Sequence, residues 1–347
     1  MQENGTIRHC YDIIGEGRPD DYVIAPTKHI EDYKIKAPPF AEILKSSEIR
    51  TLARRYELQD QDAVIAQKKF KQIFERSNML VMLTGMFVAL LIATAALVAE
   101  LPDWLEKILL VVFGIGGVIS GGIASRDVFI IREGRVLENW MSKRASAETT
   151  RLDYFKNVME LPGSSPTVNG NRIELLKLEY FRRFQLEVQL AFYRERGKYH
   201  LLEASRTLSY SGWAVAGAAI ASGSAGVLGA IQTSYAAIGA LGSVFAGLSY
   251  YASMREAVSQ DRRNAERYAR TFHVLEDLYA MLDEVRRAVQ DLGMGPLMDF
   301  VKAVNEQISL EHRQWLGENE RVRDAVSQLQ DTLKKFTSEI TPTPNTT

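Results

Sequence analysis

The chain has a single cysteine, Cys10, and no group of residues that resembles a catalytic centre. One cysteine cannot form an internal disulfide, which fits a reducing cytoplasm without excluding other compartments. The histidines are scattered, with neither a His-Glu-x-x-His spacing nor a cysteine pair for zinc: they are His9, His29, His200, His273 and His312. We therefore expect no catalytic residues, no cofactor, no metal and no nucleic-acid partner.

Charge is absent from three long segments, although 24% of all residues are charged and the net charge is −1. Residues 77–99 and 108–125 carry no charge, and residues 207–254 form one uncharged run of 48 residues. About 20 apolar residues cross the hydrocarbon core of a bilayer, so the first two runs predict one span each and the third predicts two. The alternative is a buried helix of a soluble protein, which rarely has more than about 14 uninterrupted apolar residues.

Lysine and arginine are concentrated at the same end of each predicted hairpin. The basic residues at the membrane boundaries are Arg76, Arg126, Arg206 and Arg255. In contrast, residues 100–107 have one basic and three acidic residues, and residues 232–234 have no charge. Because cytoplasmic loops carry the excess of lysine and arginine, we expect both hairpin turns outside and both termini in the cytoplasm. No signal peptide is expected in the polar first 48 residues.

The predicted fold is an all-α polytopic membrane protein with four transmembrane helices in two hairpins and long cytoplasmic helices that form a bundle. In each half, a second cytoplasmic helix is expected to continue directly from the membrane. We divide the chain into a polar N-terminal segment (1–48), a first hairpin with its cytoplasmic helices (49–161), a second (172–317), a coiled-coil-like helix (318–338) and a disordered tail (339–347).

Apolar residues recur every seven positions near the C-terminus, as in a coiled coil. The column is Val301, Ile308, Trp315, Val322, Leu329 and Phe336, and the polar residues Asn305, His312 and Asn319 accompany it. We expect this segment to hold subunits together or to couple them to a trigger. The alternative is a helix that packs one apolar stripe onto its own chain.

Small residues are frequent in the predicted spans, where they allow helices to approach closely. Packing within each hairpin accounts for part of them, and we expect an oligomer interface to use the rest; the candidates are Gly117, Gly121, Gly212, Gly223, Gly239 and Gly242. The candidate pore-lining polar residues are Ser120, Ser222, Ser224 and Ser243. The spans contain no ionisable residue, which argues against a proton-coupled transporter or a voltage sensor.

Two stretches with a membrane hairpin before them resemble the SLATT superfamily, the two-transmembrane effector domains of bacterial nucleotide-signalling conflict systems. The motif residues are Trp140, Arg144 and Glu148 in one stretch, and Glu311, His312 and Trp315 in the other. The resemblance covers roughly residues 50–317 as two tandem copies. It implies a multi-pass effector of the bacterial inner membrane that disrupts the membrane during anti-phage defence by abortive infection.

Residues 1–50 and those after 317 contain no recognisable sensor domain, so the trigger is left to the cytoplasmic helices or to a separate nucleotide sensor or nucleotide-producing enzyme. Three functions are therefore considered: an oligomeric effector that forms a pore or disrupts the bilayer, a membrane scaffold that recruits a cytoplasmic partner, and, last, a membrane-bound enzyme.

Overall fold

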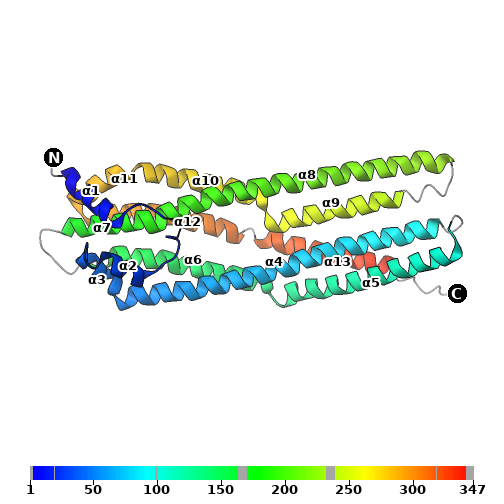
Figure 1. Cartoon of the computed structure of the whole chain (residues 1–347), viewed down its shortest axis with the longest axis horizontal. Helices are drawn as coiled ribbons and strands as arrows, with labels where there is room; N and C mark the ends of the chain where they lie inside the picture. Colours follow the sequence, from blue (N-terminus) through cyan, green and yellow to red (C-terminus); the bar gives the residue numbers. More distant parts are fainter. Residues whose placement is uncertain are drawn as a thin grey trace. The chain divides into compact units, whose positions relative to one another are not determined.

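The computed structural model describes residues 3–18, 20–97, 101–162, 170–231, 239–317 and 319–340, in which all regular structure is helical (Figure 1). This confirms the all-α class for the described part of the chain. The helices are α1 (Glu3–Ile14), α2 (Pro26–Tyr33), α3 (Pro38–Lys45), α4 (Ser47–Ala96), α5 (Asp103–Glu133), α6 (Val136–Glu160), α7 (Gly170–Phe181), a π-helical turn (Arg182–Glu187), α8 (Val188–Ile231), α9 (Gly239–Ser259), α10 (Asp261–Ala280), α11 (Leu282–Leu292), α12 (Met294–Gly317) and α13 (Asn319–Ile340).

The chain forms two compact units, each assembled from three separate stretches. The first unit consists of Met1–Ala66, Trp140–Tyr199 and Arg263–Gly317. The second consists of Gln67–Asn139, His200–Arg262 and Glu318–Thr347. Each unit therefore contains residues from both of the halves expected from the sequence. The long helices α4 and α8 each contribute residues to both units.

The two halves share a break at the end of the second hairpin helix. Arg135 separates α5 from α6 with φ +45°, and Gln260 separates α9 from α10 with φ +50°. A left-handed conformation at a residue other than glycine ends an α-helix. The expectation that a cytoplasmic helix continues directly from the membrane is therefore wrong at these two points, whereas α4 and α8 are unbroken.

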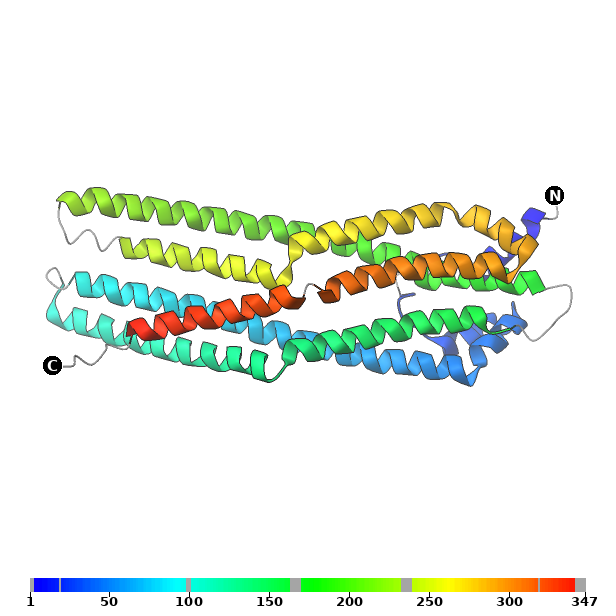
Figure 2. The ribbon, with the colours of Figure 1, turned by 180° about the vertical axis from the view of Figure 1, so that it is seen from behind.

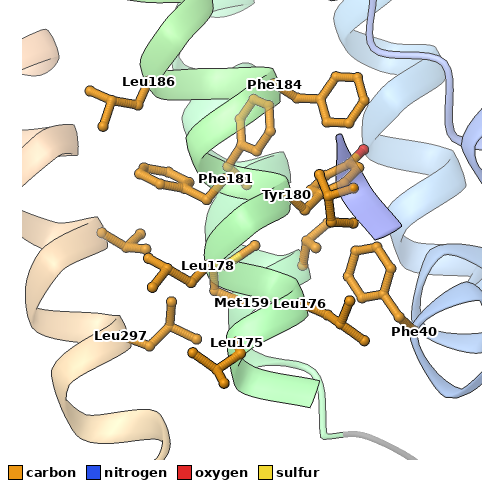
Figure 3. Close-up of a cluster of buried hydrophobic side chains, with 14 of the residues drawn as sticks. Phe40, Met159, Leu175, Leu176, Leu178, Tyr180, Phe181, Phe184, Leu186 and Leu297 are labelled. Atoms are coloured by element: carbon orange, nitrogen blue, oxygen red, sulfur yellow. The ribbon is translucent and has the colours of Figure 1, made fainter. Parts of the chain in front are cut away.

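The core of the first unit is built around α7, which contacts α1, α3, α11 and α12. Figure 3 shows Leu297 of α12 on one side of α7 and Phe40 of α3 on the other. Leu178, Tyr180 and Phe181 are fully buried, as expected for a helix that is covered on all sides. The N-terminal segment is part of this core, since it contributes buried apolar residues that include Cys10, Ile13, Ile14, Phe40 and Leu44.

Three helical stretches of the described chain are long and apolar enough to cross a membrane: Ser47–Ala96, Asp103–Glu133 and Asn171–Ile231. The fourth predicted span falls partly on α9, but residues 232–238 lie outside the described residues. Large apolar side chains are exposed along α5 and α8 of the second unit; they include Ile108, Val111, Ile115, Val118, Ile119, Trp213, Ile220 and Val227. Soluble proteins rarely expose so large an apolar surface, so these helices have the surface of a membrane protein.

The period-seven column is divided between the two units. Val301 and Ile308 are buried in the core of the first unit, and Val322 and Leu329 are buried in the second. This arrangement corresponds to the alternative in which the column packs on its own chain. Helix α13 extends to Ile340, past the predicted end at 338, and residues 341–347 of the predicted tail lie outside the described residues.

Candidate functional site

Two of the motif residues, Arg144 and Glu148, belong to a network of ion pairs on α6 in the first unit. The carboxylate of Glu148 forms ion pairs with Arg144 Nη2 at 2.5 Å and with Arg151 Nη2 at 2.8 Å, one at each oxygen. Arg144 also donates to Asp60 of α4 at 3.2 Å. Glu148 is 8% exposed, whereas the Arg144–Asp60 pair that connects α6 to α4 is partly exposed.

The second group of motif residues lies on α12 in the same unit. Glu311 forms an ion pair with Arg267 of α10 at 3.1 Å and accepts a hydrogen bond from the hydroxyl of Tyr193 of α8 at 3.3 Å. The ring of Trp315 contacts that of Trp140 edge-on, with centroids 5.5 Å apart, and the ring of His312 stacks on Trp315 with centroids 5.7 Å apart. The structure thus brings together motif residues that are more than 150 positions apart in the sequence.

Burial and neighbouring charges shift the titrations in this cluster in opposite directions. Burial would raise the pKa of Glu148, but Arg151 and Arg144 outweigh it and hold that pKa below its ordinary value. Burial raises the pKa of Glu311 even though Arg267 opposes the shift. Burial also lowers the pKa of His312, against the opposing field of Glu148. The cluster therefore contains an ionised carboxylate beside a histidine that favours its neutral form.

The cluster of motif residues and their partners joins several helices. Its members come from α4, α6, α8, α10 and α12, so it connects five helices of the first unit. The described residues contain no group of three histidine, cysteine, aspartate or glutamate side chains that could hold a metal ion. Removing one partner of a buried ion pair costs several kcal/mol, because the other charge is left buried and unpaired. Such a network therefore favours one arrangement of the helices that it connects.

A second buried network, which the sequence did not reveal, surrounds the π-helical turn in the first unit. Arg182 donates to Glu179 and Glu187 at 2.5 Å each, and Arg183 donates to Asp21 at 2.7 and 2.9 Å. The same two guanidinium groups donate to the carbonyl oxygens of Gly15 and Ile14. These contacts bind the N-terminal segment to the turn, and π-helical turns are frequent at functional positions.

A chain of hydrogen bonds lies next to this turn. The hydroxyl of Tyr180 is 2.8 Å from His29 Nδ1 and 2.8 Å from the hydroxyl of Tyr154. His29 is 4% exposed, and its ring lies 4.2 Å from that of Phe184 between centroids. Burial lowers the pKa of His29 to about 4, so the imidazole is neutral at physiological pH. The sequence predicted no role for this histidine.

Ion pairs close both hairpins of the second unit at the predicted cytoplasmic boundary. Arg76 of α4 donates to the buried carboxylate of Asp127 of α5. Glu203 of α8 accepts Arg206 at 2.6 Å and Arg255 of α9 at 2.8 Å. Three of the four predicted boundary arginines are therefore in ion pairs, and the fourth, Arg126, is exposed.

The predicted small and polar residues of the spans have different surroundings. Gly117 is buried. A Cβ atom added at Gly121 would lie 3.4 Å from Thr84 of the same, first hairpin, and Cβ atoms added at Gly239 and Gly242 would lie 3.3 Å from Ala225 and 2.8 Å from Ser222 of the second. Ser120 is buried and hydrogen-bonds Thr84 at 2.9 Å. Ser222 and Ser243 are exposed, and Ser224 is half-buried, so the structure does not gather the four serines.

The remaining predicted glycines lie on an outward face of α8. Gly212, Ala216, Ala219, Gly223 and Gly226 are all exposed and follow one another at helical spacing. Cβ atoms added at Gly212, Gly223 and Gly226 would meet no atom within 4 Å among the described residues. We call this surface the α8 small-residue face. It differs from the outward face of α5, where isoleucine and valine predominate.

A comparison of the chain with protein-family models, with curated proteins and with solved structures finds no match.

Proposed function

We propose that the chain is an oligomeric membrane effector that disrupts the bacterial inner membrane when it is triggered. In this proposal α9 forms part of a fourth span, the chain crosses the bilayer as two hairpins, and both termini lie in the cytoplasm. The proposal fits the absence of ionisable residues from the predicted spans, since proton-coupled transporters and voltage sensors need them.

The observation that carries the proposal is the α8 small-residue face. A helix that faces only lipid has no need of glycine, which weakens it by up to about 1 kcal/mol per residue relative to alanine. Within a membrane, small residues favour close contact with another helix. Gly239 and Gly242 allow α8 and α9 to approach closely inside the second hairpin. In contrast, Gly212 and Gly223 face outward, where a second copy of the chain could pack.

The trigger is proposed to act on the first unit. The resemblance to SLATT effectors implies a nucleotide signal that comes from a separate sensor or a nucleotide-producing enzyme. The cluster formed by the motif residues and their partners supports a role of the first unit in triggering, because a change at Glu148 or Glu311 would alter the packing of several helices at once.

Reconstitution tests the proposal directly. The purified full-length chain, placed in vesicles at increasing protein-to-lipid ratio, is expected to release an entrapped dye above a threshold ratio, because assembly depends on concentration. Release that rises only in proportion to protein, without a threshold, would argue against an oligomer. Absence of release at every ratio would exclude membrane disruption by the protein alone.

A scaffold that recruits a cytoplasmic partner is the second candidate. The observation that favours it is an open groove on α4 in the first unit, lined by Ser47, Arg50, Thr51, Arg54, Arg55, Leu58 and Gln59. The three arginines are exposed and would suit an acidic partner. A scaffold would leave the vesicles sealed, so the dye-release experiment separates the two functions.

A further inference from the structure

Helix α13 lies along both hairpins of the second unit. It contacts α5 of the first hairpin and α9 of the second, and Figure 2 shows it (red) between them. Its apolar stripe is covered by these contacts: Val322, Val326, Leu329 and Leu333 are buried. The opposite side of the helix carries charged, exposed residues, which include Arg321, Asp324, Asp331 and Lys334.

Polar contacts attach α13 to α5 and the start of α6 on one side and to α9 on the other. Arg323 donates to Glu138 at 2.9 Å, and Arg132 near the end of α5 donates to Gln330 at 2.7 Å. On the other side, the hydroxyl of Thr332 lies 2.9 Å from that of Tyr250 of α9. These groups are mostly exposed, so salt and competing partners can weaken the contacts.

The end of α13 reaches the first span. A Cβ atom added at Gly85 would lie 2.9 Å from the ring of Phe336, so the ring occupies the space that a side chain at position 85 would need. Gly85 lies inside the uncharged run 77–99. Helix α13, which is charged on one side, therefore places the ring of Phe336 beside the first predicted span.

We propose that α13 is an autoinhibitory helix: bound across α5 and α9, it holds the two hairpins in a resting arrangement, and its release permits them to rearrange and assemble. The proposal rests on the proposed effector function, because inhibition is defined by membrane disruption. A single apolar stripe and exposed polar contacts can be released without unfolding the hairpins. The charged side suits the helix to water once it has left.

Two readouts test the proposal in the full-length chain. The first is labelling of Leu329→Cys, introduced in a Cys10→Ser background, by a membrane-impermeant maleimide that reaches the cytoplasmic side. Leu329 is fully buried, so labelling reports departure of α13. The second is dye release from vesicles. The test variant is Gly85→Leu, which displaces the Phe336 ring. Its matched control is Gly122→Leu on α5, where an added Cβ atom meets nothing within 4 Å among the described residues.

Gly85→Leu is expected to raise the labelling rate about tenfold or more, since labelling follows the open population, and to raise dye release with it. Gly122→Leu should behave as the parent does. Adding Phe336→Ala to Gly85→Leu makes room for the leucine, so the double variant should return both readouts toward the parent. If Gly85→Leu does not fold, Phe336→Ala alone supplies the test, because it removes the anchor without enlarging a span, and it should also raise both readouts.

Faster labelling without more dye release would overturn the inhibitory role, provided that the parent releases dye at high protein-to-lipid ratio. Unchanged labelling in both Gly85→Leu and Phe336→Ala would show that the Phe336 contact does not hold α13, and would overturn the proposal as well. If the parent and every variant leave the vesicles sealed at all ratios, the proposed effector function itself fails, which is a separate result.

Discussion

The guanidinium of Arg76 donates two hydrogen bonds of 2.6 Å to the carboxylate of Asp127, which is completely buried. This bidentate pair joins the two helices of the first hairpin where they leave the predicted membrane. The second hairpin has a pair of opposite polarity, with Glu203 on its first helix and Arg255 on its second. Bidentate contacts of this kind fix orientation as well as contributing energy.

Asp127→Asn is expected to destabilise the protein modestly, because a hydrogen bond to a charged group contributes more than a neutral one, although solvent screens the exposed Arg76. Thermal unfolding in detergent measures the effect as a lower Tm. Arg126→Gln, at the neighbouring exposed position, is the control and should leave Tm nearly unchanged. Equal Tm values for Asp127→Asn and the parent would show that the pair does not stabilise the hairpin.

The α8 small-residue face predicts a difference between two glycine variants. Gly223→Leu should insert and fold as the parent does but form smaller assemblies, because the side chain projects from an outward face. Gly242→Leu should lower Tm, because its side chain collides with Ser222 and Ala218 in the same hairpin. Cross-linking in the membrane measures assembly, and thermal unfolding measures stability. A Gly223→Leu variant that assembles like the parent would show that this face contacts lipid alone.

The transmembrane character was predictable because a run of uncharged residues is a local property of the chain. The burial of charge near the π-helical turn was not. Arg182 and Arg183 follow one another in a stretch with alternating charge, which is typical of a solvated helix face. Glu179 and Glu187 lie nearby in the sequence, but the other groups that the two arginines contact, at Gly15 and Asp21, lie more than 160 positions away. No local pattern therefore shows that these arginines are buried.

The first unit should lose stability on acidification because of His29. Burial lowers its pKa from 6.5 to about 4, so between these values the unfolded chain binds more protons than the folded chain. The contribution of His29 is complete above pH 6.5, falls as the pH drops, and is lost by about pH 4. Its full size is on the order of 3 kcal/mol, at about 1.4 kcal/mol per pKa unit.

The natural cysteine offers a probe for this effect, since Cys10 is fully buried in the same core. A pyridyl disulfide, which reacts with thiols in acid, should label Cys10 progressively faster below pH 6.5. His29→Phe should weaken this pH dependence, while His273→Gln, at an exposed position, should retain it. A pH dependence that is the same in His29→Phe and the parent would assign the effect to another group.

The C-terminal column illustrates a different limit of sequence analysis. A repeat of seven predicts that one stripe of α13 is buried, and Val322 and Leu329 are indeed buried. The repeat cannot tell whether the covering surface belongs to another copy or to the same chain. Deciding that requires the positions of α5 and α9, which come from residues about 200 and 80 positions earlier.

Topology provides a further prediction. Reporter fusions at both termini should read as cytoplasmic, and reporters inserted at Asp103 and Thr233 should read as extracytoplasmic, because lysine and arginine are concentrated at the opposite end of each hairpin. A terminus that reports from the outside would contradict the arrangement of two hairpins.

The most direct test of the effector function is the membrane potential of bacterial cells in which expression of the full-length chain is induced stepwise. We expect the potential to collapse above a threshold level of protein, and growth to stop at the same level. A potential that stays normal at the highest expression, with the protein confirmed in the inner membrane, would contradict the function proposed here and favour a scaffold.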